Sequence, residues 1–239
     1  MQTVTLSLFR FGSVGARVWA FAQMGFARAP LSRMPGLRFW KLLGSGVGEG
    51  FTPLPNTGVY AILCVWESED AAREGLSARV FKRYRAQSEE NWTLWLEPTS
   101  VRGQWSAKEP FDAPDKTPAM TGPIAALTRA TIKPSILLRF WGRVPSISKV
   151  IGKDPSVMFK IGVGEVPWFH QVTFSIWPDA KSMAQFARAG GPHAQAIKAV
   201  REGEWFSEEL YARFKVTGQT GHWTGTKGLD GLTQVEVTP

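Results

Sequence analysis

The chain has 239 residues, a net charge of +8 at pH 7, eleven tryptophans and one cysteine. A single cysteine excludes an internal disulfide framework, and no run of 18 apolar residues predicts a membrane-spanning helix. The first residues alternate like a strand and do not follow the pattern of a signal peptide, so we expect a cytoplasmic protein. The positive charge favours an anionic partner such as nucleic acid, acidic lipid or an acidic protein.

Six elements are predicted in the first half of the chain. They are a strand at 4–8, a helix at 17–26, strands at 39–43 and 59–66, a helix at 71–84 and a strand at 92–96. The first strand has apolar residues at every second position, the period of a half-buried strand. Ser68 precedes two acidic residues, a favourable start for the helix that follows. The order β-α-β-β-α-β is the ferredoxin-like plan.

The second half of the chain predicts the same order. Its elements are a strand at 125–132, a helix at 136–151, strands at 157–161 and 171–177, a helix from about 179 and a strand at 210–216. Apolar residues at helical spacing support the first of these helices. The segment 108–123 is rich in Pro, Asp, Ala and Thr, and we expect it to link the two halves.

Short phrases of the first half return in the second half in the same order. Residues 39–42 and 46–49 correspond to 158–161 and 162–165, and 103–106 correspond to 221–224. Such an internal repeat indicates one folding unit used twice. We therefore predict an α+β fold in which two tandem ferredoxin-like repeats form a pseudo-dimeric α+β barrel. The predicted parts are a first repeat (1–107), a linker (108–123), a second repeat (124–225) and a variable C-terminal tail (226–239).

The three histidines are weighed individually. His170 opens a strand, and His222 lies in a Gly-rich phrase where we expect it to be exposed. His193 shares one predicted helical face with Phe186 and Ile197, and no histidine occupies the matching position of the first half. A hydrogen-bonded core histidine is the commoner explanation of such a residue. The alternative is an axial ligand to haem iron.

Other patterns indicate less specific roles. The Gly-rich segment 44–49 leads into a strand and lacks the spacing of a phosphate-binding loop, so we predict a turn. No Cys and His spacing typical of a zinc site occurs. The basic run 82–85 fits a solvated helix face, and no aromatic platform for bases can be placed beside it. We therefore expect no nucleic-acid partner.

Phrases along nearly the whole chain, up to about Trp223, carry a family resemblance. They are 1–7, 18–21, 39–41, 48–53, 127–132, 159–162, 164–167, 170–178, 191–193 and 205–211. These phrases resemble spheroidene monooxygenase, a family of acyclic-carotenoid 2-ketolases of purple phototrophic bacteria. The resemblance implies an oxygenase that inserts oxygen at C2 of spheroidene to give spheroidenone. It also implies haem b as cofactor, O2 as oxidant and reduced ferredoxin as electron donor.

The resemblance also implies roles for individual residues. A similar α+β barrel binds haem through a helix histidine in chlorite dismutases and aldoxime dehydratases, which favours His193 as the iron ligand, with His170 as the next candidate. An aromatic slot for the polyene would draw on Phe140, Trp141, Trp168, Phe169 and Phe174. Haem propionates or a distal oxygen species would pair with Arg129, Arg139 and Arg143. Taken singly, these aromatic residues are more commonly core, and these arginines more commonly surface residues.

The positive charge suits both an acidic ferredoxin and an anionic membrane that holds the substrate. We therefore expect a cytoplasmic protein that is peripheral to the photosynthetic membrane. Two other hypotheses remain open. A cofactor-free barrel oxygenase is disfavoured, because a carotenoid end group forms no stabilised carbanion. A non-catalytic haem- or carotenoid-binding protein would bind pigment without consuming oxygen.

Overall fold

Eight strands form the frame of the protein. The computed structural model describes residues 1–48, 50, 52–115, 121–142, 156–188 and 205–237. Within them the strands are β1 (Thr3–Arg10), β2 (Leu37–Gly46), β3 (Pro55–Trp66), β4 (Glu90–Gly103), β5 (Ile124–Ile132), β6 (Phe159–Gly164), β7 (His170–Trp177) and β8 (Phe206–Gly221). Neighbouring strands are antiparallel, and the order β1-β3-β2-β6-β7-β5-β8-β4 closes into a barrel.

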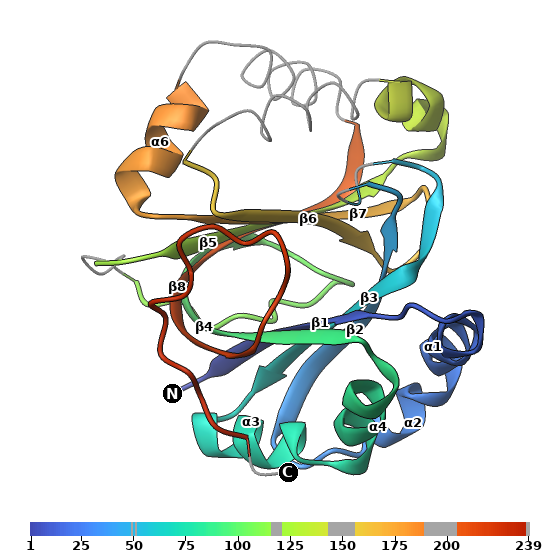
Figure 1. Cartoon of the computed structure of the whole chain (residues 1–239). Helices are drawn as coiled ribbons and strands as arrows, with labels where there is room; N and C mark the ends of the chain where they lie inside the picture. The colour runs from blue at the N-terminus through green and yellow to red at the C-terminus, as the bar shows by residue number, and fades with distance from the viewer. Residues whose placement is uncertain (49, 51, 116–120, 143–155, 189–204, 238–239) are drawn as a thin grey trace.

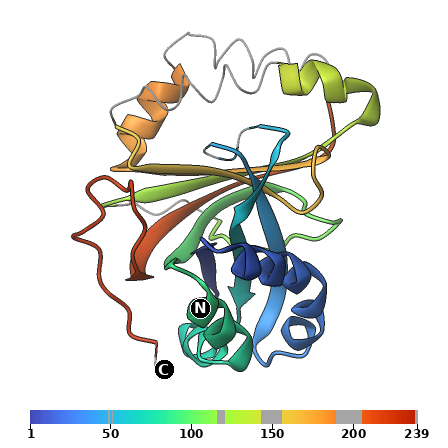
Figure 2. The same ribbon diagram turned by 45° about the vertical axis from the view of Figure 1, so that its right-hand side comes forward.

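Helices lie on two opposite sides of this barrel (Figures 1 and 2). The first side carries α1 (Val14–Phe26), α2 (Arg28–Ser32), α3 (Glu69–Leu76) and α4 (Arg79–Gln87). The other side carries η1 (Pro134–Ile136), which continues as a helix to residue 142, and α6 (Ala180–Arg188). Among the described helices, none is long and apolar enough to cross a membrane.

Each half of the chain contributes four neighbouring strands. The first half is ordered β4-β1-β3-β2 and the second β8-β5-β7-β6, so corresponding strands take corresponding places. The halves meet along the long β4–β8 ladder and along β2–β6, where Gly44 pairs with Gly164 and Ser45 with Val163. The predicted α+β barrel is therefore confirmed.

Three predicted boundaries were wrong. The helix expected at 71–84 is two helices, because Ala78 is extended and the amides of Ser77 and Ala78 bond back to carbonyls of α3. The strand expected at 157–161 is β6, two residues further along. The strand expected at 210–216 is the 16-residue β8, which pairs with both β4 and β5. Of the helix expected at 136–151, residues 143–151 lie outside the described residues.

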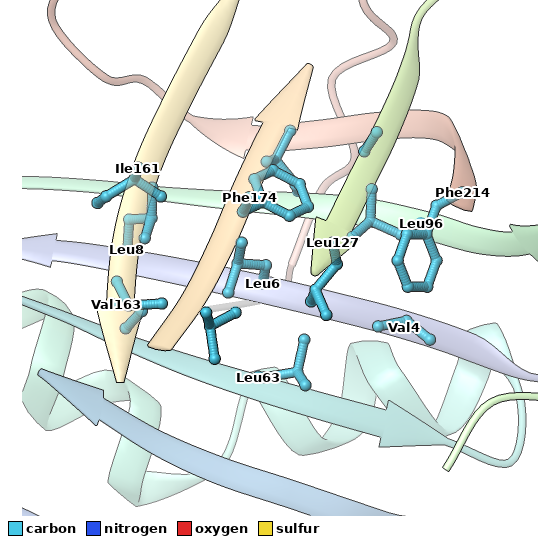
Figure 3. Packing of buried hydrophobic residues seen from close by; sticks show 14 of the residues in the cluster. Val4, Leu6, Leu8, Leu63, Leu96, Leu127, Ile161, Val163, Phe174 and Phe214 are labelled. Carbon is cyan, nitrogen blue, oxygen red and sulfur yellow. The ribbon is translucent and has the colours of Figure 1, made fainter. Parts of the chain in front are cut away.

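The barrel interior is the main hydrophobic core. Inward side chains of both halves meet there, including Leu6, Leu63, Leu127 and Phe174 (Figure 3). Each of these four is at most 2% exposed. Because one core is shared by both halves, the two sheets bury their inner faces against each other.

Segments outside the strands also belong to this packing. Phe111 lies in the predicted linker, and its ring packs edge-on against Phe214 at a centroid distance of 5.1 Å. Leu229 lies in the predicted tail, is buried, and accepts a hydrogen bond from Gln219 at its carbonyl. The described parts of the linker and the tail are therefore packed onto the barrel.

Candidate functional site

The outer face of the second sheet carries small side chains at its centre. Side chains alternate between the two faces of a strand, so the neighbours of Leu127 and Phe174 point outward. The outward residues are Ala126, Thr128 and Ala130 on β5, and Thr173 and Ser175 on β7. We call these five residues the small-residue floor. Gly162 on β6 also faces outward, but the main chain of Gly50 packs directly against it.

Strand register places the floor residues side by side. Thr173 pairs with Thr128 on one side, and Ser175 pairs with Ala126, so small residues lie side by side on β5 and β7. On its other side Thr173 pairs with Gly162, which Gly50 covers. Along β5 the floor runs from Ala126 to Ala130, a length of about 13 Å at about 3.3 Å per residue. The floor is therefore a flat area with little side-chain volume above the backbone.

The outer face of the first sheet is different. Its outward residues include Tyr60, Ile62 and Trp66, which pack against Phe81 and Tyr84 of α4. All five are at most 6% exposed. In the first half, large side chains thus fill the space between sheet and helices, whereas among the described residues the central outward side chains of β5 and β7 are small.

Apolar clusters lie at both ends of the floor. At one end, Trp177 packs against Phe186 of α6 with ring centroids 5.1 Å apart. At the other end, Phe140, Trp205 and Phe206 pack together. The chain between α6 and Trp205 contains His193, which lies outside the described residues.

Two cations border the floor on opposite strands. Lys160 on β6 pairs with Ser175, and Arg213 on β8 pairs with Ala126, so both stand in one row of the sheet. Haem combines a flat macrocycle with two carboxylates, and its iron accepts a histidine ligand. A flat floor, aromatic ends and two bordering cations fit such a group.

Four of the five predicted slot residues gather at one end of the floor. Phe140 is buried, and the indole of Trp141 donates a 2.9 Å hydrogen bond to the carbonyl of Trp168. Trp168 and Phe169 are 48% and 37% exposed. Phe174 does not join them, because the alternation of β7 directs it into the barrel core, where it is fully buried. The expectation that Phe174 lines the slot is therefore corrected.

The predicted propionate partners are separated. Arg129 points to the inner side of β5, where its guanidinium bonds Glu208 and lies 3.7 Å from Glu165. Because two carboxylates already pair with this buried side chain, the structure does not support Arg129 as a propionate partner. Arg139 lies over the Trp205 ring at 5.2 Å, near the floor. Arg143 lies outside the described residues.

Charged side chains form a cluster around Arg129 at one end of the barrel. Glu165, in the β6–β7 turn, accepts hydrogen bonds from Lys41 Nζ at 2.5 Å and from Trp105 Nε1 at 2.7 Å. Glu208 accepts the main-chain amides of Ser106 and Ala107. We call Lys41, Trp105, Arg129, Glu165, His170 and Glu208 the Glu165 cluster. It ties β2, β5, β7 and β8 to the segment after β4.

The Glu165 carboxylate is held in its charged form. Burial alone would raise its pKa, but the nearby His170 imidazole, hydrogen bonds from Lys41 and Trp105 and the charge of Lys41 outweigh burial and lower the pKa to about 2. The pKa of Glu208 is also lowered, since bonds from two amides and Arg129 outweigh its burial. The cluster thus contains two ionised carboxylates at neutral pH.

His170 lies between this cluster and the exposed aromatic residues. Its Nδ1 is 3.3 Å from Glu165 Oε2, and its side chain is 23% exposed. A carboxylate behind an imidazole is typical of a histidine that ligates a metal through its other nitrogen. This geometry keeps His170 as the second candidate for the iron ligand. His222, as expected, is exposed.

A similar arrangement occurs at the other end of the barrel. Arg10 pairs with Glu90 at 2.7 Å and lies over the Trp223 ring at 4.5 Å, while Glu90 accepts the hydroxyl of Thr224. The contacts of Arg10 with Glu90 and Trp223 correspond to those of Arg129 with Glu208 and Trp105. Here a cavity of about 280 Å³, lined in part by Lys160 and Trp223, opens beside the ion pair.

The Glu165 cluster was not predicted from the sequence, although the sequence contains signals for it. Lys41, Trp105 and Glu165 each belong to a phrase that recurs in the chain. The fold brings these three phrases to one barrel end. The floor was missed as well, and the outward positions of the strands could have revealed it through their small side chains.

Comparison with known proteins relates the whole chain to one group of sequences. No family model matches the chain. Spheroidene monooxygenase of Cereibacter sphaeroides is 53% identical over 227 residues, which cover 94% of this chain and 70% of that protein. Spheroidene monooxygenase of Rhodobacter capsulatus is 49% identical over 232 residues, which cover 96% of each chain.

The fold is shared with a solved structure of very different sequence. A crystal structure of aldoxime dehydratase superposes with a TM-score of 0.60 at 10% identity, covering 90% of this chain and 81% of the other. That similarity concerns the barrel and its helices. The sequence identities over most of the length decide the relationship: the chain belongs to the spheroidene monooxygenase family.

Proposed function

We propose that this protein is a haem-dependent monooxygenase that inserts oxygen at C2 of acyclic carotenoids, converting spheroidene to spheroidenone with O2 and reduced ferredoxin. Family membership supports the monooxygenase activity and the carotenoid substrate. The observation that carries the cofactor assignment is the small-residue floor on the outer face of the second sheet. The equivalent face of the first sheet carries large side chains that pack against helices.

In this proposal, haem b lies over the floor with His193 as the iron ligand and His170 as the alternative. Lys160, Arg139 and Arg213 are the candidate partners of the propionates. Bound haem supplies the activation of O2 that oxidation of an unactivated C–H bond requires, because no side chain can perform it. The protein contributes the flat surface and the histidine ligand to iron, and its apolar ends exclude water.

The aromatic end of the floor is proposed to hold the polyene. Trp141 fixes the Trp168 carbonyl, and Phe140 supports Trp141 edge-on at a centroid distance of 5.3 Å. Trp168 and Phe169 are left exposed toward an apolar ligand. His170 follows them directly, and its Nδ1 lies 3.3 Å from Glu165 Oε2.

The remaining elements of the proposal concern the architecture and the partners. We propose that the halves are tandem ferredoxin-like repeats, supported by equal strand order and by the matched Arg10–Glu90 and Arg129–Glu208 pairs. We also propose that the protein acts in the cytoplasm at the surface of the photosynthetic membrane. The net charge of +8 supports contact with anionic lipid and with an acidic ferredoxin.

Turnover in a defined mixture tests this function. Purified protein reconstituted with haem is incubated with micellar spheroidene, 18O2, and ferredoxin kept reduced. We expect mass spectrometry to find 18O in the hydroxylated intermediates and NMR to place the ketone at C2. Product should fall to background when haem, ferredoxin or O2 is omitted. Bound pigment with no oxygen consumption would contradict the proposal and favour the non-catalytic binding protein.

A further inference from the structure

Helix α1 exposes an apolar ridge to solvent. Val14, Val18 and Phe21 are spaced i, i+4 and i+7, so they share one face of the helix. They are 77%, 64% and 70% exposed, and Phe26 at the end of the helix is 74% exposed. We call Val14, Val18 and Phe21 the α1 ridge. Exposed apolar side chains that share one helix face mark an interaction surface.

The ridge is not needed to hold α1 on the barrel. The opposite side of the helix already packs inward through Ala20 and Gln23, which are buried, and through Trp19, whose ring contacts Tyr84 at 5.2 Å. The helix therefore carries apolar residues on both sides. The inward side stabilises the fold, and the outward side has no contact in the described chain that would require large apolar groups.

Positive charge surrounds the ridge. Residues 11–36, which contain α1 and α2, include no Asp or Glu but three arginines. Arg17, Arg28 and Arg33 are exposed beside the ridge, and within the described residues none of the three forms an ion pair. Arg17 and Arg28 each donate Nε to a main-chain carbonyl. Their guanidinium charges are therefore available to an external anion.

Helix α4 extends this basic area. Arg83 stacks on the Trp19 ring at 5.6 Å, which places α4 next to α1, and Lys82 is exposed beside Arg83. One acidic residue, Glu89, lies at the margin, against Gly12 before the start of α1. The surface thus combines an apolar line with basic flanks, the composition of helices that lie in a membrane interface.

We infer that the α1 ridge is the surface through which this protein docks onto an anionic lipid bilayer. Two copies facing each other through this ridge would bring their arginines together without any carboxylate between them, which disfavours a dimer. An anionic bilayer offers both an apolar layer for the ridge and phosphates for the arginines. The charge pattern therefore selects lipid as the occupant.

Docking through α1 is independent of the position of the proposed polyene slot. Helix α1 and the helical residues 134–142, which include Phe140 and Trp141, lie on opposite sides of the barrel (Figures 1 and 2). The docking rests on the proposed function only in that it assigns a surface to the proposed contact with anionic lipid, and it does not depend on the oxygenase activity.

Vesicle flotation tests the docking at low ionic strength. The full chain is mixed with vesicles of phosphatidylcholine containing about 30% phosphatidylglycerol and, separately, with pure phosphatidylcholine; we expect strong binding to the former alone. The double variant Val18→Ser, Phe21→Ser should bind at least about tenfold more weakly. Arg17→Gln with Arg28→Gln should weaken binding about 25-fold, or about fivefold for each charge.

Matched controls separate the ridge from general surface effects. Leu54 is as exposed as Val18, at 64%, and Leu54→Ser should bind like the parent. Lys108 is exposed far from α1 in the sequence, and Lys108→Gln should change binding less than either arginine variant. Circular dichroism and thermal melting of every variant confirm that the fold is kept.

Several results would overturn the inference. Parent-like binding by the Val18→Ser, Phe21→Ser variant would remove the ridge from the contact, and equal binding to both vesicle types would remove the anionic lipid. A change of mass in solution for that variant, without a change in flotation, would assign the ridge to a second copy of the chain. Vesicle binding is measured without turnover. A parent protein that binds vesicles but has no oxygenase activity would therefore contradict the proposed enzymatic function and still support the docking.

Discussion

Thr173→Phe is expected to weaken haem binding about a hundredfold and to lower oxygenation accordingly, while the protein stays folded. Thr173 belongs to the small-residue floor and pairs with Thr128 on β5. A phenyl ring there occupies the space above the floor that the proposed cofactor requires. Overpacking of this kind costs about 3 kcal/mol, so haem affinity should fall about a hundredfold. Phenylalanine is favourable in strands, and β7 itself should persist.

The matched control adds the same ring elsewhere on the barrel surface. Thr217 is an exposed residue of β8, and Thr217→Phe should bind haem like the parent. Haem titration followed by absorption, together with thermal melting, measures both variants. Parent-like haem affinity in a folded Thr173→Phe variant would show that the cofactor does not lie over the floor.

Glu165→Gln is expected to destabilise the fold by about 3 kcal/mol. The change leaves Lys41 without its carboxylate partner and removes one of the two carboxylates around buried Arg129. Breaking a buried pair from one side costs about 3–5 kcal/mol. The lower end applies, because Glu165 is 15% exposed and Arg129 keeps Glu208. Urea unfolding at pH 7 measures the difference.

The same variant should lose part of the acid sensitivity of the fold. The pKa of Glu165 is lowered to about 2 by the nearby His170 imidazole and by hydrogen bonds from Lys41 and Trp105, which together outweigh burial. Its stabilising contribution is therefore complete above about pH 4.5 and is lost as the pH falls toward 2. The gap between parent and variant should narrow over that range. Glu74→Gln, at an exposed position, is the control and should unfold like the parent at every pH. A gap that stays constant down to pH 2 would contradict this role of Glu165.

Much of the fold was predictable because its signals are local. Alternation in β1 and the cap at Ser68 depend on residues close together in the chain, and both elements are found. The α3–α4 break was not predictable in the same way. It depends on the extended conformation of Ala78, which no turn residue at that position marks. The length of β8 likewise depends on two partner strands, β4 and β5.

The candidate site was predictable in part. Phe140, Trp141, Trp168 and Phe169 were expected to act together, and the structure gathers them at one end of the floor. The Glu165 cluster required the closure of the barrel, which joins residues as distant as Lys41 and Glu165.

Comparison of the two repeated phrases could have identified the floor from sequence. Ile62 of the first copy corresponds to Thr173 of the second. This change replaces a large apolar outward residue with a small polar one. Such a one-sided loss of side-chain volume indicates a face that binds another group instead of packing on helices.

The absorption spectrum of the haem-reconstituted protein, measured beside His193→Ala and His170→Ala, tests the central claim most directly. Haem bound over the floor through His193 predicts a Soret band in the parent, its loss or shift in His193→Ala, and its retention in His170→Ala. A band lost in His170→Ala and unchanged in His193→Ala would transfer the ligand to the residue beside Glu165. A parent without any Soret band would contradict the haem-dependent mechanism.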